Sequence, residues 1–255
     1  MPKIKKRRFL KVVFLFGGSL FFVAAGTILI WTAFLKIPDF NKFEERKVTQ
    51  STKIYDRTGE VLLFDVHQEV KRKVIPPNEI SRLIKNAAVA IEDAEFYQHK
   101  GVKPKSILRA FLVNLGSGSV KQGGSTITQQ VIKNALLSSE RTITRKIKEA
   151  LLAIKLEKAM SKEEILGIYL NESPFGGSMY GVEEASQTFF GKSAKDVSLA
   201  EAAYLAALPK APTYYSPYGN HKKELDQRKN AVLARMGELG FITKEEELSA
   251  QKEPV

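Results

Sequence analysis

Cysteine is absent from the 255-residue sequence, and histidine is scarce, with only His67, His99 and His221. The absence of cysteine excludes thiolate nucleophiles, disulfide frameworks, zinc–thiolate sites and iron–sulfur clusters. The histidines are scattered and do not have the spacing of a helical zinc site such as HExxH. A Rossmann or P-loop glycine pattern is also missing. A metal site in this chain would therefore have to be built from oxygen ligands.

Acidic residues are outnumbered by basic ones, 28 to 40, which gives a formal net charge of +12. Because 44% of the residues are hydrophobic, this charge does not indicate a disordered chain. Half of the surplus lies in residues 1–11, which contain six basic residues and no acidic one. The six basic residues at the start of the chain thus account for half of the surplus positive charge, and nucleic-acid binding is not predicted.

Residues 12–35 form a run of 24 without one ionisable side chain. A membrane-spanning helix needs about 20 apolar residues, whereas the apolar region of a cleaved signal peptide, the alternative, has about 7 to 15. Trp31 and Lys36 mark the far end of the run, and the basic flank belongs on the cytoplasmic side. We predict a cytoplasmic tail over 1–11, a transmembrane helix over 12–35 and an extracytoplasmic remainder. Such a domain has no access to ATP, so energy for synthesis would have to arrive in the substrate.

The remainder divides into a short β-rich part and a long helical part. Residues 36–75 read as a linker followed by a hairpin, with two β-rich runs around a turn at 56–59. Residues 76–245 predict one mainly α domain whose first helix has Asn78 as its N-cap, and 246–255 read as a polar tail. The apolar periodicity predicts helices over residues 80–91, 106–115, 125–137, 142–160, 162–171, 181–190, 199–208 and 222–239.

A glycine-rich segment at residues 116–124 leads directly into a helix that starts with Ser125 and Thr126. Free amides at a helix N-terminus, with hydroxyl groups beside them, favour an anionic or hydroxyl-rich ligand. An ordinary linker with a serine N-cap is the alternative interpretation.

Two glutamates are candidates for chemistry. Glu92 ends an apolar helical stripe, at the edge of the buried face, where a carboxylate suits general acid or base catalysis. Alternatively, it is a solvated neighbour of Asp93. Glu149 follows Arg141 and Arg145 at four-residue steps, on a face away from the predicted core stripe of Ile143, Ile147, Leu151 and Ile154. These residues form either a row of surface salt bridges or a set of cations for a phosphate leaving group.

Residues 92–101, EDAEFYQHKG, resemble the EDxxFxxHxG motif of the peptidoglycan glycosyltransferases, glycosyltransferase family 51. Residues 124–134, GSTITQQVIKN, resemble the second motif of that family. Residues 145–149 and 165–171 resemble the third motif, residues 181–185 and 189–192 resemble the fourth, and residues 199–209 resemble the fifth. The resemblance implies a mainly α, lysozyme-like glycosyltransferase domain with a small membrane-touching jaw subdomain, preceded by the transmembrane helix and the hairpin.

The resemblance also implies an inverting reaction that polymerises lipid II into β-1,4-linked glycan and releases undecaprenyl pyrophosphate. Glu92 would be the general base, and Glu149 a second catalytic carboxylate that organises the pyrophosphate site. Phe96 and His99 would support the Glu92 loop. No organic cofactor is implied, although a divalent cation such as Mg²⁺ could bind at Glu149. The implied substrate-binding residues are Asp93, Ser125, Thr126, Gln130, Lys133, Asn134, Arg141, Arg145 and Lys146. A pyrophosphate leaving group needs such cations more than a general acid.

The expected setting is the inner, or plasma, membrane, with a single pass and a cytoplasmic N-terminus. The expected partners are lipid II, the nascent glycan strand, the bilayer, which residues 107–115 would touch, and other cell-wall synthesis proteins. Class A penicillin-binding proteins continue into a transpeptidase domain, which we do not expect here because SxxK occurs only at 249–252, with no KTG after it. A fragment of such a protein and a natural monofunctional enzyme both fit. An inactive membrane-anchored scaffold and a lysozyme-like glycan-cleaving enzyme are the rival functions.

Overall fold

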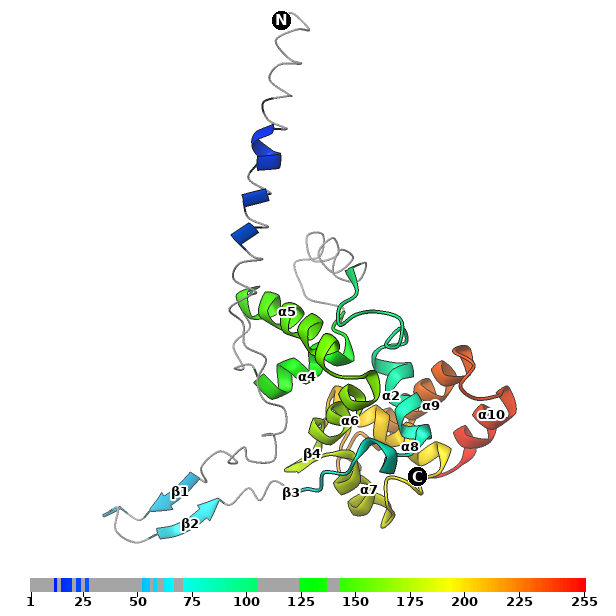
Figure 1. Cartoon of the computed structure of the whole chain (residues 1–255). Helices are drawn as coiled ribbons and strands as arrows, with labels where there is room; N and C mark the ends of the chain where they lie inside the picture. The colour runs from blue at the N-terminus through cyan, green and yellow to red at the C-terminus, as the bar shows by residue number, and fades with distance from the viewer. Residues whose placement is uncertain are drawn as a thin grey trace, which may run out of the picture. The chain divides into compact units, whose positions relative to one another are not determined.

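The chain is divided into two units, residues 1–38 and 39–255, which are described separately. The computed structural model (Figure 1) describes residues 12, 15–19, 22–23, 26–27, 52–55, 57–58, 62–66, 71–104, 124–136 and 143–255. In this part of the chain most residues are helical, in agreement with the predicted fold class.

In the first unit, all the described residues are helical. The hydroxyl groups of Ser19 and Thr27 each donate a hydrogen bond of 2.8 Å to the carbonyl oxygen four residues earlier. No helix within the described ranges is long and apolar enough to cross a membrane. The span predicted over 12–35 lies largely outside these ranges, and the tail over 1–11 and the membrane-contacting stretch over 107–115 lie entirely outside them. All three stay predictions.

The predicted hairpin is confirmed. Strand β1 (Thr52–Tyr55) pairs antiparallel with β2 (Leu62–Val66). A second, three-stranded sheet has the order β3-β5-β4, with β3 (Lys71–Arg72) parallel to β5 (Met179–Tyr180) and β4 (Pro174–Gly176) antiparallel to it. The sequence indicated only a loop over residues 173–180, because strands this short have no readable alternation.

The described α-helices up to α9 follow the predicted ranges closely, whereas no helix was predicted where α10 lies, and the helix expected over 106–115 lies outside the described residues. The described helices are α2 (Arg82–Glu92), α4 (Ile127–Leu136), α5 (Ile143–Ala159), α6 (Lys162–Glu172), α7 (Val182–Phe190), α8 (Leu199–Ala207), α9 (Lys222–Glu238) and α10 (Lys244–Lys252), with 3₁₀ helices η2 (Pro77–Glu79) and η3 (Leu208–Lys210).

The predicted N-cap of the first α-helix is wrong. Asn78 lies inside η2, which ends at Glu79 and is followed by Ile80, a residue with extended backbone. The α-helix α2 begins only afterwards, and its N-cap is Ser81, whose hydroxyl accepts a hydrogen bond from the Leu83 amide. The two prolines at 76 and 77 set a separate short turn, so the start signal was read one turn too early.

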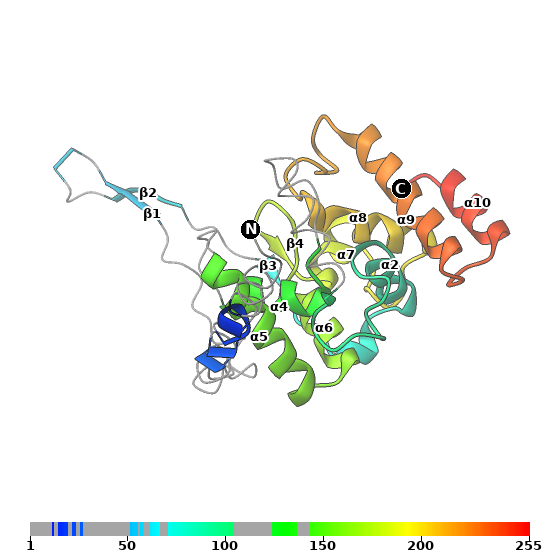
Figure 2. The same cartoon turned by 90° about the horizontal axis from the view of Figure 1, so that it is seen from above.

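The core of the second unit is centred on α8. Seven of its nine residues are buried, and most of these are alanines, which allow close approach of other helices. Helix α8 contacts both α2 and α9, which also contact each other, while α4 contacts α5 and α6 (Figure 2). A separate jaw subdomain is not distinguished within residues 39–255 and stays a prediction.

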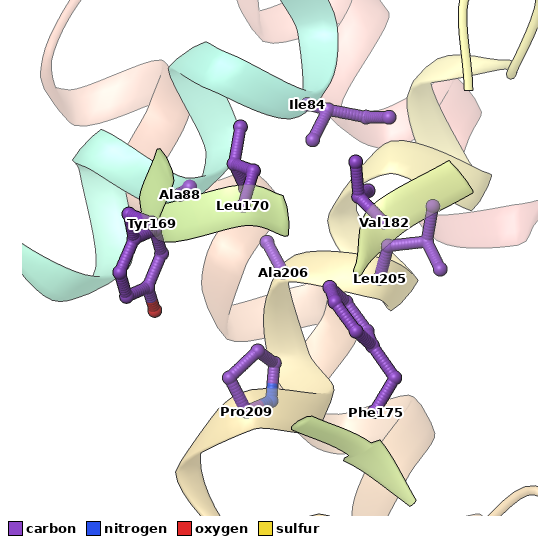
Figure 3. Close-up of a pocket in the computed structure, with 9 residues that line it drawn as sticks. All are labelled: Ile84, Ala88, Tyr169, Leu170, Phe175, Val182, Leu205, Ala206 and Pro209. Carbon is purple, nitrogen blue, oxygen red and sulfur yellow. The ribbon is translucent and has the colours of Figure 1, made fainter. Parts of the chain in front are cut away.

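A small cavity lies inside this core. Figure 3 shows its lining, which includes Ile84 and Ala88 of α2 and Leu205 of α8, and its volume is about 10 Å³. A water molecule needs roughly 10 to 15 Å³ and several polar partners. Because the lining is apolar, the cavity is a packing imperfection and not a substrate site.

The buried face of α5 differs from the predicted one. Ile147, expected in the core, is 38% exposed, whereas Glu149, Leu152, Ala153 and Leu156 are buried. These four residues have three- and four-residue spacing, so they share one face of the helix. Glu149 therefore lies on the buried side of α5 and not on a surface face.

The last residues are not only a polar tail. Helix α10 begins with a capping box between Thr243 and Glu246, and Glu247 and Ala250 are buried. The ammonium group of Lys229 on α9, itself buried, donates a 2.8 Å hydrogen bond to the carbonyl oxygen of Glu253. The C-terminal helix is therefore part of the folded domain.

Candidate active site

Glu92 is the last residue of α2, and its side chain is held from two directions. The Gln130 amide on α4 donates a 2.7 Å hydrogen bond to Oε2, and the Arg228 guanidinium on α9 lies 3.8 Å from Oε1. Only 17% of the Glu92 side chain is exposed. The carboxylate is therefore partly accessible but fixed in orientation.

Asp93 anchors the loop that follows Glu92. Its carboxylate is buried and accepts a hydrogen bond of 3.0 Å from the Ile127 amide at the start of α4. His99 Nε2 and Lys103 Nζ lie 2.8 and 2.6 Å from its two oxygens. Burial alone would raise the pKa of Asp93, but the contacts with His99, Lys103 and Ile127 lower it below its ordinary value. Both oxygens are engaged within the protein, and the substrate contact expected for Asp93 stays a prediction.

Phe96 and His99 also contact the protein and not an open site. The Gly101 amide donates a 3.2 Å hydrogen bond to His99 Nδ1, so Nε2 carries the proton that faces Asp93. The Phe96 ring is fully buried, edge-on to His99, and the Lys162 ammonium lies 4.4 Å from its centroid. Both side chains thus pack within the protein beside the Glu92 loop, and the supporting role expected for them stays a prediction.

The N-terminus of α4 is occupied by protein groups. The buried Thr126 hydroxyl donates a 2.6 Å hydrogen bond to the Gly101 carbonyl. The backbone amide of Thr126 donates a 3.0 Å hydrogen bond to Oε1 of Gln129, and the backbone amide of Gln129 donates a 3.1 Å hydrogen bond to Oγ1 of Thr126. The backbone amide of Ile127 donates to the Asp93 carboxylate. The amides of 126, 127 and 129 thus all bind protein groups, and the ligand role expected for Thr126 stays a prediction.

Ser125 belongs to a second cluster, with Lys146 and Glu149 of α5. The Lys146 ammonium donates a 2.7 Å hydrogen bond to the Ser125 hydroxyl and also binds Glu149 Oε1. The Lys146 side chain is 51% exposed, whereas that of Glu149 is 1% exposed. Oε2 of Glu149 is buried, with no hydrogen-bond partner among the described residues. The cluster therefore presents a cation at the surface, above a buried carboxylate.

Helix α4 connects the two clusters. Ser125 precedes it, and Gln130, which binds Glu92, lies on it. Lys133 and Asn134 follow Gln130 by three and four residues, so they lie on the same side of the helix, and both are exposed. Arg145, on α5, is partly buried, and Arg141 lies outside the described residues.

The described side chains do not form a metal site. No group of three or more histidine and acidic residues that could hold an ion occurs in the described ranges. The neighbour of Glu149 is the Lys146 ammonium, a cation that competes with a metal ion for the same oxygen. The divalent cation expected at Glu149 stays a prediction, and no catalytic step is assigned to it.

Two residues beside Glu92 were missed in the sequence. Arg228 lies on a polar stretch of α9 far along the chain and belongs to none of the five motifs. Tyr169 of α6 is buried, and burial together with the negative charge of Glu92 raises its pKa. No local signal could have identified either residue, because their proximity to Glu92 comes from helix packing.

A helical domain that fixes a partly exposed glutamate and presents cations nearby is that of an enzyme suited to glycosidic chemistry on an anionic substrate. A family model described as Transglycosylase matches residues 59–237. Because the match covers more than half of the chain, the protein belongs to this transglycosylase family.

Curated relatives agree with this assignment. Penicillin-binding protein 1A of Aquifex aeolicus is 43% identical over 244 residues, which are 96% of this chain and 32% of the relative. Penicillin-binding protein 1F of Bacillus subtilis is 38% identical over 88% of this chain and 32% of the relative. The crystal structure of penicillin-binding protein 1A from Haemophilus influenzae is similar at 27% identity and a TM-score of 0.46, over 82% of this chain and 21% of that one. The chain thus spans about a third or less of the length of these proteins.

Proposed function

We propose that this chain is a peptidoglycan glycosyltransferase that polymerises lipid II into β-1,4-linked glycan. The observation that carries the proposal is the Glu92 carboxylate, fixed by Gln130 at 2.7 Å and partly open to solvent. The transglycosylase family match supports it, since Glu92 falls inside the matched residues 59–237.

Glu92 acts as the general base in the proposed reaction. It takes the proton from the 4-hydroxyl group of the acceptor sugar as that oxygen attacks the anomeric carbon of the lipid-linked donor strand. The new C–O bond forms as the bond to the pyrophosphate oxygen breaks, and the leaving group departs with the electron pair. Attack from the face opposite the leaving group inverts the anomeric configuration.

Positively charged side chains stabilise the leaving group in the proposed reaction. A pyrophosphate leaves already ionised, so positive charges near its oxygens stabilise the transition state more than a proton donor would. Lys146 and Lys133 are exposed and supply such charges. The buried Glu149 contacts the Lys146 ammonium and holds it in place. Arg141 and Arg145 are assigned to the same task from the family resemblance.

The proposed cellular setting follows the sequence. Residues 12–35 anchor the chain in the plasma membrane with residues 1–11 in the cytoplasm, so the domain meets a lipid-linked substrate at the outer surface. Lipid II, the growing glycan strand and the bilayer are the proposed partners, together with other cell-wall synthesis proteins.

The test is polymerisation of lipid II in detergent by the full chain, with products separated by size. The Glu92→Gln variant should lose activity by about 100-fold or more, the usual contribution of a general base. Glu95→Gln is the matched control, because the Glu95 side chain is 63% exposed and, within the described ranges, forms an ion pair only with Lys103, at 3.8 Å. It should retain near-normal activity.

Three results would contradict the proposal. A folded chain that does not lengthen glycan favours an inactive scaffold, and one that shortens preformed strands is a lysozyme-like hydrolase. Equal activity of the Glu92→Gln variant and the unmodified chain would remove the assignment of the base.

A further inference from the structure

Arg228 is fixed by three separate elements. Its Nε donates a 2.9 Å hydrogen bond to the carbonyl oxygen of Ala207 at the end of α8, and its guanidinium carbon lies 5.7 Å from the centroid of the Tyr215 ring. The third contact is the 3.8 Å approach to Glu92 Oε1. Only 12% of the Arg228 side chain is exposed. The cation therefore has little freedom to move away from Glu92.

The contacts of the two Glu92 oxygens differ in kind. Gln130 makes a hydrogen bond of ordinary length to Oε2. The 3.8 Å distance from Arg228 to Oε1 is too long for a hydrogen bond but short enough for a strong ionic interaction. Among the described residues, no donor lies within hydrogen-bond distance of Oε1. Oε1 thus feels a nearby positive charge while its lone pairs stay free to accept a proton.

We infer that Arg228 is a positioning residue that holds the Glu92 carboxylate so that Oε1 faces the acceptor hydroxyl. The inference rests on the proposed function, in which Glu92 is the base. Gln130 holds Oε2 by a hydrogen bond, and Arg228 holds Oε1 by an ionic contact that leaves its lone pairs free.

The expected kinetic signature is a fall in kcat without a matching change in KM. Arg228 acts on Glu92 and is not a substrate contact, so lipid II should bind as before. Arg228→Met keeps most of the apolar side chain but removes the charge, and kcat should fall about 10- to 100-fold, a typical loss for one charge-assisted contact. Arg228→Lys restores a cation and should recover part of that loss.

Arg235→Met is the matched control. Arg235 lies two turns later on α9 and pairs with Glu238 at the surface, where its side chain is 43% exposed. This variant should keep the normal kcat. Urea unfolding of all three variants, as full chains in detergent, shows whether a loss of rate follows a loss of fold.

Four outcomes decide the matter. Loss of kcat in Arg228→Met with partial rescue in Arg228→Lys supports the inference. Unchanged kcat in Arg228→Met overturns it while leaving the proposed function intact. A raised KM with unchanged kcat overturns it in favour of substrate binding. An unmodified chain that does not polymerise lipid II overturns the proposed function, and this inference with it.

Discussion

Replacing Gly101 by alanine should destabilise the folded domain more than the same change at Gly240. Both glycines have positive φ, +88° and +71°, a region that alanine rarely adopts. They differ in their surroundings. A Cβ atom on Gly101 would lie 2.6 Å from the carbonyl oxygen of Ala153, whereas a Cβ on Gly240 would have no atom within 4 Å. Gly240→Ala therefore measures the backbone cost alone.

The expected loss in the free energy of unfolding has two parts, the cost of the left-handed backbone and the cost of the steric clash. The left-handed backbone costs alanine about 1 to 2 kcal/mol, offset by about 0.4 to 1 kcal/mol because alanine restricts the unfolded chain. Gly240→Ala should therefore cost about 1 kcal/mol. At Gly101 the clash is with the backbone of α5, which cannot rotate away, and forced overpacking adds about 1 to 3 kcal/mol. The expected total for Gly101→Ala is about 2 to 4 kcal/mol.

The assay is urea unfolding of the full chain in detergent, with the free energy of unfolding extrapolated to water. Activity of Gly101→Ala should also fall, because the Gly101 carbonyl accepts the Thr126 hydrogen bond and its amide binds His99 in the loop behind Glu92. If Gly101→Ala costs no more than Gly240→Ala, the close contact between this loop and α5 is not present in solution, and the reasoning fails.

Two further changes test the supports of the site and the C-terminal helix. Asp93→Asn should lower the free energy of unfolding at pH 7 by about 3 to 5 kcal/mol, because it leaves His99 and Lys103 without their buried partner; a loss below about 1 kcal/mol in urea unfolding would contradict this. The pKa of Asp93 is lower in the folded than in the unfolded chain, so its stabilisation is complete above about pH 4 and is lost as pH falls through the folded-state value. The free energy of unfolding should thus fall less steeply below pH 4 in Asp93→Asn than in the unmodified chain. Thr243→Ala removes the capping box with Glu246 and should lower the free energy of unfolding by about 1 kcal/mol. No change in urea unfolding would mean that α10 does not depend on its cap.

The helices that were predicted well have strong local signals. The apolar repeat of α2 and the serine that begins α6 are readable without any tertiary information. A capping box requires only residues three apart, and the structure shows one at Ser161 and Glu164. Such features depend on neighbours within one turn, so the sequence alone is sufficient to find them.

Helix α5 shows where this reasoning fails. Its isoleucines suggested one buried stripe, but the buried stripe contains Glu149 and Ala153. Gly101 leaves room for the Ala153 backbone, and Lys146 contacts one oxygen of Glu149. Which face of an amphipathic helix is buried depends on the surface that it meets, and that surface comes from other parts of the chain.

The sequence by itself determined the helical class, the hairpin, the family motifs and the choice of Glu92 as the candidate base. Only the tertiary structure decided what surrounds that base. It showed that Asp93 and Thr126 bind other groups of the protein, and it placed Arg228 beside Glu92. The physical reason is that motif residues are recognised by type and spacing, whereas contacts between distant residues depend on how α2, α8 and α9 pack together.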